Sequence, residues 1–436
     1  MLEENLTDLY EAGFGGVEVA LFSSQVAYNN SEYGFGTENW RETMKNILKI
    51  AAGFENGFRV DFTLSPCWPV AVNNLDPNDV SADQQLVYAW KKLDAASGIV
   101  DLPMPATDTH DLGGNAFITQ DRLVGAVIGQ VASVNADGTP VLAPESLRVL
   151  QTELSGHTTV AGIPSVEGLA ENSPEYQYVL ELYSGEAEDT MTFFEDKLAN
   201  VEGEKNSAED MVIENTALPD TSVFFEDSAG NPISLRTALA DTQDYWTVDL
   251  AQAELGEYAP SEGDTLAAGD YVLYGFYNRG TGGTTSDYSS FWFVIGSIFQ
   301  DALPGVAYWI SLFEEAGVDA LIAYLDENIF CDEELVALLQ DAADTVGGAF
   351  FEDSLENRYP DGIAWAESYA SFFAEQNGYD LTAFLPFVTG AAESAGGDGA
   401  RYWEDYNTTI SRMYQQNHIA PLQEYLHEKV GYNYRA

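Results

Sequence analysis

Both ends of this chain alternate segments of helical hydrophobic spacing with short apolar runs, and this alternation restricts the fold more than any other feature. Apolar residues at helical spacing in residues 2–12 lead into an apolar run at 17–22, and the same order returns at 40–52 and 58–64. A strand-length run after each helical segment predicts parallel βα units.

The last part of the chain repeats this pattern. An apolar run at 347–353 ends in carboxylates, and Gly431 precedes what has the pattern of another strand. Helical patterns are found at 316–328, 332–343, 365–377 and 401–430. We therefore predict the α/β class, with parallel βα units at both ends of the chain.

The middle of the chain has a different pattern. Short β-rich runs, such as 123–134, 221–225 and 271–277, are separated by turns rich in glycine, asparagine and aspartate. Regular turns with few long helical patterns predict a β-rich, sandwich-like insertion. The predicted domains are the first βα units at 1–98, the insertion at 99–290 and the continuation of the βα units at 291–436.

The charge of the chain excludes two classes of partner. The chain has 71 acidic and 17 basic side chains and a formal net charge of −54. Binding to nucleic acid needs clusters of Lys and Arg, and so does attraction to an anionic membrane surface. A hydrophobic fraction of 45% and an aromatic fraction of 13% exclude a disordered chain. The acidic excess fits an extracellular or a high-salt setting, where like charges maintain solubility.

One segment, residues 291–313, is apolar and long enough to suggest a membrane span. Gln300, Asp301 and Pro304 lie at its centre, and a central carboxylate is costly in lipid. We therefore expect a buried strand followed by a helix, and no membrane partner.

Asp353 and Glu356 are the strongest candidates for catalysis. They belong to the sequence Glu-Asp-Ser-Leu-Glu, which begins at Glu352 directly after an apolar run. In a parallel βα barrel, active sites lie at the carboxyl ends of the strands. Glycoside hydrolysis needs one carboxylic acid to protonate the leaving oxygen and a second carboxylate to activate water or attack the sugar. The alternative is that so acidic a chain places carboxylates at strand ends without a catalytic role.

Three further residues are candidates for substrate binding. Glu18 interrupts an apolar run, which is costly unless the carboxylate is paired or faces a polar cavity. Asp61 interrupts the second run, and Trp68 follows it in a proline-bounded turn, where its ring could stack against a sugar. The alternatives are an outward-facing position for Glu18 and a core position in a rigid turn for Trp68.

Other catalytic signatures are absent from the sequence. It contains no nucleophile elbow, no P-loop and no zinc-protease motif, and no metal ligands can be assigned. The four histidines are isolated, and we expect each to be structural or on the surface: His110, His157, His418 and His427.

Several stretches together carry a resemblance to a known family. They include Gly-Gly-Val-Glu-Val around Glu18, Cys-Trp-Pro around Trp68, Asp-Ser-Leu-Glu at 353–356, Gly-Tyr-Asp-Leu at 378–381 and the region from 405 to the end. In this order they resemble the glycoside hydrolases of family 106, which are α-L-rhamnosidases, and related secreted glycoside hydrolase-like proteins.

The resemblance implies a partial (β/α)8 barrel of the TIM type, interrupted by the β-rich insertion. It implies hydrolysis of terminal α-L-rhamnosyl linkages with inversion, by two carboxylates and with a bound calcium ion (Ca2+). Glu356 would be the general acid, and Asp353 beside it would set its pKa or bind the sugar. Glu18 would lie in the pocket or near the metal.

The sequence also departs from this family. Family members are longer, so we expect a fragment or a faulty gene model, in which residues 296–312 are read-through sequence and the catalytic base lies beyond residue 436. The expected setting is extracellular, although no signal peptide is evident, and the expected partner is a carbohydrate substrate.

Two alternatives stay open: a non-catalytic carbohydrate-binding or structural extracellular protein, and another glycosidase specificity on the same scaffold. The sequence does not define the oligomeric state.

Overall fold

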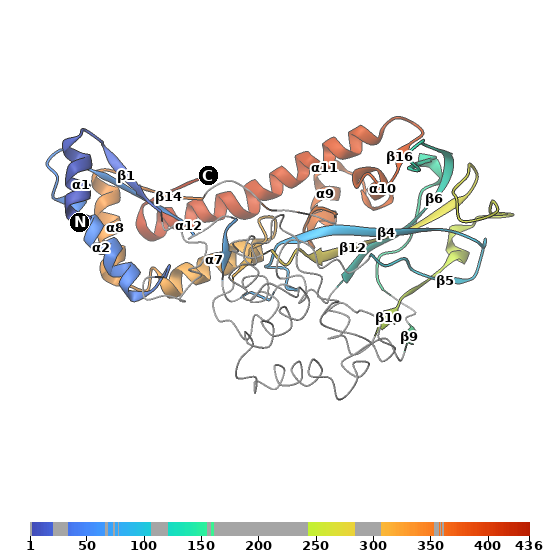
Figure 1. The fold of residues 1–436 in the computed structure, drawn as a ribbon, viewed down its shortest axis with the longest axis horizontal. Coiled ribbons are helices and arrows are strands. Elements are labelled where there is room, and N and C mark those ends of the chain that lie inside the picture. The colour runs from blue at the N-terminus through green and yellow to red at the C-terminus, as the bar shows by residue number, and fades with distance from the viewer. Residues whose placement is uncertain are drawn as a thin grey trace, which may run out of the picture.

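The described residues form two lobes that a long helix connects (Figure 1). The computed structural model describes residues 2–20, 34–65, 69–72, 75–76, 78–105, 121–154, 158–160, 243–283, 307–352, 357, 359 and 362–436. One lobe holds a parallel sheet, and the other holds an antiparallel sheet. The helices α11 (Gly399–Tyr414) and α12 (Ala420–Val430) run between the two lobes.

Four parallel strands form the sheet of the first lobe, in the order β1-β2-β14-β17. Their bounds are Gly16–Val19 for β1, Arg59–Thr63 for β2, Ala349–Phe351 for β14 and Asn433–Arg435 for β17. The accompanying helices are α1 (Leu2–Glu11), α2 (Glu38–Ala52), α7 (Glu315–Asn328), α8 (Glu333–Thr345) and α12. The prediction of the α/β class, with parallel strands joined through helices, is confirmed.

One face of the parallel sheet is apolar and packs against the helices. The Phe62 and Phe350 rings, from neighbouring strands, lie with their centroids 5.8 Å apart. Phe350 also meets the edge of Phe330, which follows α7, and Phe330 in turn packs against Tyr425 of α12. Successive strand residues point to opposite faces of a sheet. The residues next to Phe62 and Phe350 in their strands therefore point to the other face.

The opposite face of the sheet carries charged side chains. Glu18 and Asp61 are partners in the register of β1 and β2, and Arg435 lies on the outer strand at the far side. Glu18 and Arg435 nevertheless form an ion pair. Neighbouring strands are about 4.8 Å apart, so this pair reaches across three strand spacings. The sheet therefore curls toward its polar face.

The second lobe is built on a sheet with the order β15-β4-β12-β6-β7-β16, with β8 also paired to β6. The strands are β4 (Gln84–Lys92), β6 (Asp121–Val134), β7 (Pro140–Leu142), β8 (Arg148–Gln151), β12 (Tyr271–Gly280), β15 (Gly362–Trp365) and β16 (Glu393–Ser394). Strands β4, β15 and β16 come from outside the predicted insertion and still join this sheet. The proposed limits of the three domains stay a prediction.

Both faces of the antiparallel sheet are buried. Tyr274 and Phe276 of β12 belong to the main core, which also contains residues of α9 (Tyr369–Asn377), α10 (Leu385–Val388) and α11. Leu273 and Tyr277 of the same strand belong to a second core with Leu250. The remaining strands form short pairs: β3 (Ala71–Val72) with β13 (Tyr308–Trp309), β5 (Ile99–Asp101) with β11 (Thr247–Asp249), and β9 (Thr158–Val160) with β10 (Gln243–Tyr245).

Two predicted elements differ in detail from the structure. The helix expected at 365–377 begins only at Tyr369, because residues 362–365 pair with β4 as strand β15. The helix expected at 401–430 is interrupted by a π-helical segment, η8 (Gln415–Ile419). The strand expected at 221–225 lies outside the described residues.

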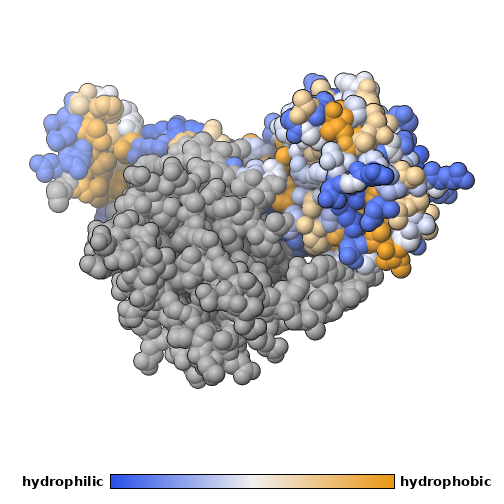
Figure 2. Space-filling model, turned by 45° about the vertical axis from the view of Figure 1, so that its right-hand side comes forward, coloured by the Kyte–Doolittle hydropathy of each residue, from blue (hydrophilic) through white to orange (hydrophobic). Residues whose placement is uncertain are grey.

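Within the described part of the chain, no helix has both the length and the apolar character that crossing a membrane requires. Most of the apolar segment 291–313 lies outside that part. Among the described residues, five large apolar side chains are exposed: Leu2, Phe14, Trp90, Ile99 and Trp403. Figure 2 shows hydrophilic and apolar residues mixed over the visible face of the described lobes.

Candidate active site

The candidate active site lies at the carboxyl end of the parallel sheet, where β14 delivers Glu352. The backbone N–H of Glu352 donates to the carbonyl of Arg435 at 2.8 Å, so Glu352 continues the pairing with β17. Active sites of parallel βα folds form at this edge of the sheet. Glu352 is only 3% exposed, and a buried carboxylate is stable only with polar partners.

Two aromatic residues supply these partners. The Nε2 atom of His418 lies 2.7 Å from Oε2 of Glu352, and the hydroxyl of Tyr434 donates to the same oxygen at 2.9 Å. An ionised Glu352 only accepts hydrogen bonds, so His418 must then donate from Nε2. The Nδ1 atom of His418 is buried with no hydrogen-bond partner among the described residues.

His418 is carried by the π-helical segment η8, between α11 and α12. Such segments are frequent at functional sites. The ring of His418 stacks on Tyr414, and the hydroxyl oxygens of Tyr414 and Tyr434 lie 3.4 Å apart. Burial raises the pKa of Tyr414 to about 12 and also raises the pKa of Tyr434. Both phenols therefore stay neutral at physiological pH and keep their protons for hydrogen bonds.

A second buried carboxyl group, Asp83, lies between β3 and β4. Its backbone N–H donates to the carbonyl of Trp309 at 2.9 Å. Its side chain accepts hydrogen bonds from Oγ1 of Thr281 at 3.2 Å and from the hydroxyl of Tyr359 at 3.4 Å. Burial raises the pKa of Asp83 to about 7, although these hydrogen bonds oppose the rise. Asp83 therefore changes its protonation near neutral pH.

The contact between Asp83 and Tyr359 joins the chain that follows β2 to the chain that follows β14. These two strands are neighbours in the parallel sheet, so the segments that leave them start at the same edge. Asn357 lies in the second of these segments, and its Oδ1 atom is buried with no hydrogen-bond partner among the described residues. A group of buried polar side chains thus lies beyond the edge at which β14 delivers Glu352.

Glu18 and Asp61 lie on the polar face of the sheet, and each has a partner there. Glu18 is exposed on β1 and pairs with Arg435, whose guanidinium lies 4.5 Å from the centre of the Phe351 ring. Asp61 is buried and accepts from the backbone N–H of Ala349 at 2.8 Å and from Nε of Arg59 at 2.7 Å. Asp61 therefore links β2 to the start of β14, and its expected role in substrate binding stays a prediction, as does that of Glu18.

The other predicted site residues lie outside the described residues: Asp353, Glu356 and Trp68. The chain connects the first two to the site, because they lie between Glu352 and Asn357. Within the described residues, no three carboxylate, imidazole or thiol groups are grouped to hold a metal ion. The calcium ion that the resemblance implies stays a prediction.

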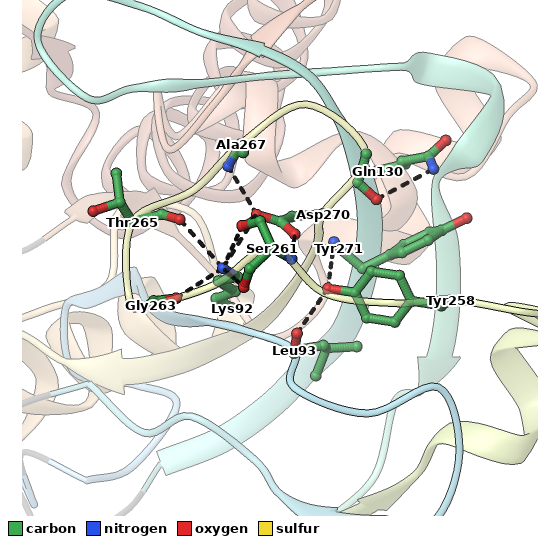
Figure 3. A network of polar contacts seen from close by, with 11 residues as sticks. Lys92, Leu93, Gln130, Tyr258, Ser261, Gly263, Thr265, Ala267, Asp270 and Tyr271 are labelled. Carbon is green, nitrogen blue, oxygen red and sulfur yellow. Dashed lines mark hydrogen bonds and ion pairs between the residues drawn. The ribbon is translucent and has the colours of Figure 1, made fainter.

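A separate polar network ties the end of β4 to the loop before β12 (Figure 3). The ammonium group of Lys92 donates to Oγ and the carbonyl of Ser261 and to the carbonyls of Gly263 and Thr265, at 2.6–3.2 Å. It also pairs with Asp270 at 3.3 Å. Burial acts to raise the pKa of Asp270, but hydrogen bonds from Ser261, Lys92 and the loop backbone lower it to about 2. This network braces the antiparallel sheet.

Sequence reasoning missed four of the residues that gather at this edge. Asp83, Asn357 and Tyr359 had no signal of their own, because their meeting depends on the tertiary fold. His418 was expected to be structural or on the surface, and it is completely buried; its partner Glu352 was not foreseen, although His418 lies in a stretch that carries the family resemblance. The resemblance of that stretch was the only sign in the sequence that His418 could lie near the site.

Known proteins that resemble this chain are found among solved structures. No protein-family model matches the chain, and no curated protein matches it. Among solved structures, a rhamnosidase from Novosphingobium sp. PP1Y is similar over 99% of the chain, with 13% sequence identity and a TM-score of 0.45. The chain spans 44% of the length of that protein. At this identity and score, the similarity does not identify the reaction.

Proposed function

We propose that the protein is a glycoside hydrolase that removes terminal α-L-rhamnosyl residues. One observation supports this most: β14 is a strand of a parallel sheet that ends at Phe351, and the sequence that follows it contains Glu352, Asp353 and Glu356. Carboxylates at the carboxyl end of such a strand meet the chemical requirement of glycoside hydrolysis. The resemblance of the Asp-Ser-Leu-Glu and Gly-Tyr-Asp-Leu stretches suggests the sugar.

In this proposal, the parallel sheet is part of a (β/α)8 barrel, and the antiparallel sheet belongs to a β-rich insertion. The character of the two faces of the parallel sheet supports the proposal of a barrel. Helices cover the apolar face, as they cover the outside of a barrel. The curled polar face, with Glu18, Asp61 and Arg435, would face the barrel interior.

The proposed reaction consumes one water for each glycosidic bond. Glu356 gives its proton to the glycosidic oxygen as the bond to the anomeric carbon breaks. A second carboxylate removes a proton from the attacking water on the opposite face, so the anomeric configuration inverts. A negative charge on Asp353 disfavours ionisation of its neighbour, which keeps Glu356 protonated. Glu18, Asp61 and Trp68 would shape the sugar pocket, and the setting would be extracellular.

Release of p-nitrophenol from p-nitrophenyl α-L-rhamnopyranoside tests this proposal, in a panel with other p-nitrophenyl glycosides. The protein is made as this chain and from the complete reading frame that encodes it. We expect hydrolysis of the rhamnoside in preference to the other sugars. Glu356→Gln should lower kcat/KM by about 10²–10⁴-fold, because it removes a general acid.

Glu404→Gln is the matched control, since Glu404 is an exposed carboxylate on α11. It should leave the rate unchanged. Hydrolysis of a different glycoside would replace the proposed sugar while keeping the class. If the folded protein binds rhamnosides but hydrolyses no glycoside, it is a carbohydrate-binding protein and the proposed activity is wrong.

A further inference from the structure

Asp83 lies where β4, β12 and β13 meet the chain that follows β14. Its backbone N–H donates to the carbonyl of Trp309 in β13, and its carbonyl accepts from the N–H of Thr281, which follows β12, each at 2.9 Å. Its carboxyl group accepts from Oγ1 of Thr281 at 3.2 Å and from the hydroxyl of Tyr359 at 3.4 Å. The N–H of Gly362, the first residue of β15, donates to the carbonyl of Tyr359 at 3.3 Å. One carboxyl group thus connects segments that are far apart in the sequence.

The hydrogen-bond partners of this carboxyl group are neutral. Besides Thr281 and Tyr359, they are the backbone N–H of Gln84 and the amide of Asn357, and none of them carries a positive charge. Asp83 is only 1% exposed, and a carboxylate that is buried without a cation is costly. The closed site therefore favours the neutral carboxyl group, in agreement with the raised pKa of Asp83.

The charged side chains on the neighbouring segments have partners of their own. These pairs are Asp79 with Ser81 before β4, Arg279 of β12 with Asp121 of β6, and Arg122 of β6 with Glu367. Strand β13 carries no charged side chain. Tyr359 is itself titratable, but burial raises its pKa far above its ordinary range, so it stays neutral. The ionisation of Asp83 is therefore decided by its own burial and hydrogen bonds.

We propose that Asp83 is a pH-dependent clamp between the antiparallel sheet and the chain that follows β14. With a neutral carboxyl group, Asp83 holds Tyr359 against the end of β12. When the carboxyl group releases its proton, the contact opens and water reaches the carboxylate, because hydration replaces the counter-ion that the closed site lacks. Asn357 fits the neutral state, since its Oδ1 is buried with no hydrogen-bond partner among the described residues and can accept the carboxyl proton.

The linkage between protonation and opening gives the direction and size of the effect. The closed state holds the proton up to about pH 7, whereas an open state releases it near pH 4, as an exposed carboxyl group does. The open fraction should therefore rise about tenfold per pH unit between about pH 4 and pH 7, and it should stay constant above pH 7. The clamp is closed most firmly in acid.

Hydrogen–deuterium exchange measures this opening at three amides, those of Asp83, Thr281 and Gly362. Asp83→Asn keeps the size of the side chain and stays neutral at every pH. The ratio of the exchange rates of the natural protein and this variant, taken at each pH, removes the pH dependence of the intrinsic rate. We expect this ratio to rise about 10²-fold between pH 5 and pH 7 and to level off above pH 7. A ratio that stays constant at all three amides would overturn the proposal.

Two controls separate the clamp from general effects. Asp76→Asn changes an exposed carboxyl group in the segment before β4 and should give the exchange rates of the natural protein. The slowest amides of the protein, which exchange by global unfolding, should exchange more slowly than the three clamp amides at every pH. Equal rates would show that Asp83 acts on the whole fold without a local opening, which would also overturn the proposal.

Tyr359→Phe tests the contact across the clamp. It removes a hydroxyl that lowers the pKa of Asp83 by favouring the ionised form. The closed state should then hold the proton to a higher pH, so the rise in the exchange ratio, again measured against Asp83→Asn, should continue beyond pH 7. A rise that ends at the same pH as in the natural protein would contradict the part assigned to Tyr359.

Discussion

Buried carboxyl groups in this acidic protein have very different pKa values. Asp83 is buried with weak hydrogen bonds, and its pKa rises to about 7, whereas Asp270 is buried with strong ones, and its pKa falls to about 2. The number and charge of the hydrogen-bond donors, rather than burial alone, set the pKa of these two carboxyl groups apart.

The raised pKa of Asp83 predicts a specific pH dependence of stability. The folded protein holds this proton up to about pH 7, whereas the unfolded chain releases it near pH 4. The contribution of Asp83 to the free energy of unfolding is therefore fully present below pH 4. It falls by about 1.4 kcal/mol per pH unit as the pH rises toward 7.

Asp83→Asn should remove this dependence. Urea unfolding of both proteins between pH 4 and pH 8 gives the difference in free energy of unfolding, in which the other carboxylates largely cancel. The variant should gain stability relative to the natural protein as the pH rises. A difference that does not change with pH would show that Asp83 titrates in its ordinary range.

At the scale of single residues, the sequence could nominate carboxylates but not their partners. Glu18 and Asp61 were identified because a charge inside an apolar run needs an explanation. Their observed partners, Arg435 and the N–H of Ala349, are distant in sequence. His418 and Asp83 were missed for the same reason, since only the folded chain brings Glu352 and Tyr359 to them.

At the scale of elements, Gly431 connects α12 to β17 and has a strict backbone requirement. Its φ is +73°, in the left-handed region, and an added Cβ would lie 2.8 Å from Cβ of Ala343. Gly378 ends α9 with a φ of +76°, but nothing lies within 4 Å of an added Cβ there. The two glycines therefore share the backbone constraint and differ in the space around them.

Alanine at these two glycines should separate the two effects. Gly378→Ala should cost about 1–2 kcal/mol, which is the price of the left-handed conformation for a residue with a side chain. Gly431→Ala should cost about 1–3 kcal/mol more, because Ala343 must also move. Chemical denaturation measures the free energy of unfolding of both variants. Equal losses would show that α8 and α12 can separate at this point without cost.

The elements themselves were largely predictable. Helices with clear apolar periodicity, such as α2 and α8, and apolar runs bounded by glycine, such as β14, were found close to their observed bounds. Strand β15 was missed because its pairing with β4 overrides the helical pattern around Trp365. The π-helical segment has no sequence signature, and it decides where His418 points.

At the scale of the whole molecule, one continuous core joins the two sheets. The same buried apolar cluster contains Phe62 of the parallel sheet, Phe276 of the antiparallel sheet and Met413 of the helix between them. The sequence predicted the character of the two parts of the chain. It could not show that α11 and α12 span both lobes, because that depends on packing between residues that are hundreds of positions apart (Figure 1).

Because the two sheets share one core, the proposed site lies between them. The chain that follows β2 and the chain that follows β14 meet at Asp83, where the edge of the parallel sheet approaches the antiparallel sheet. The central claim is that this edge is the active site of a glycoside hydrolase and that Glu356 is its general acid.

The dependence of the rate on the leaving group tests that claim most directly. Hydrolysis of 2,4-dinitrophenyl α-L-rhamnopyranoside needs little protonation of its leaving group, whereas hydrolysis of a rhamnoside of a simple alcohol needs full protonation. The account predicts that Glu356→Gln loses about 10²–10⁴-fold in kcat/KM on the alcohol rhamnoside and far less on the dinitrophenyl rhamnoside. An equal loss on both substrates would contradict the assignment of Glu356 as the general acid.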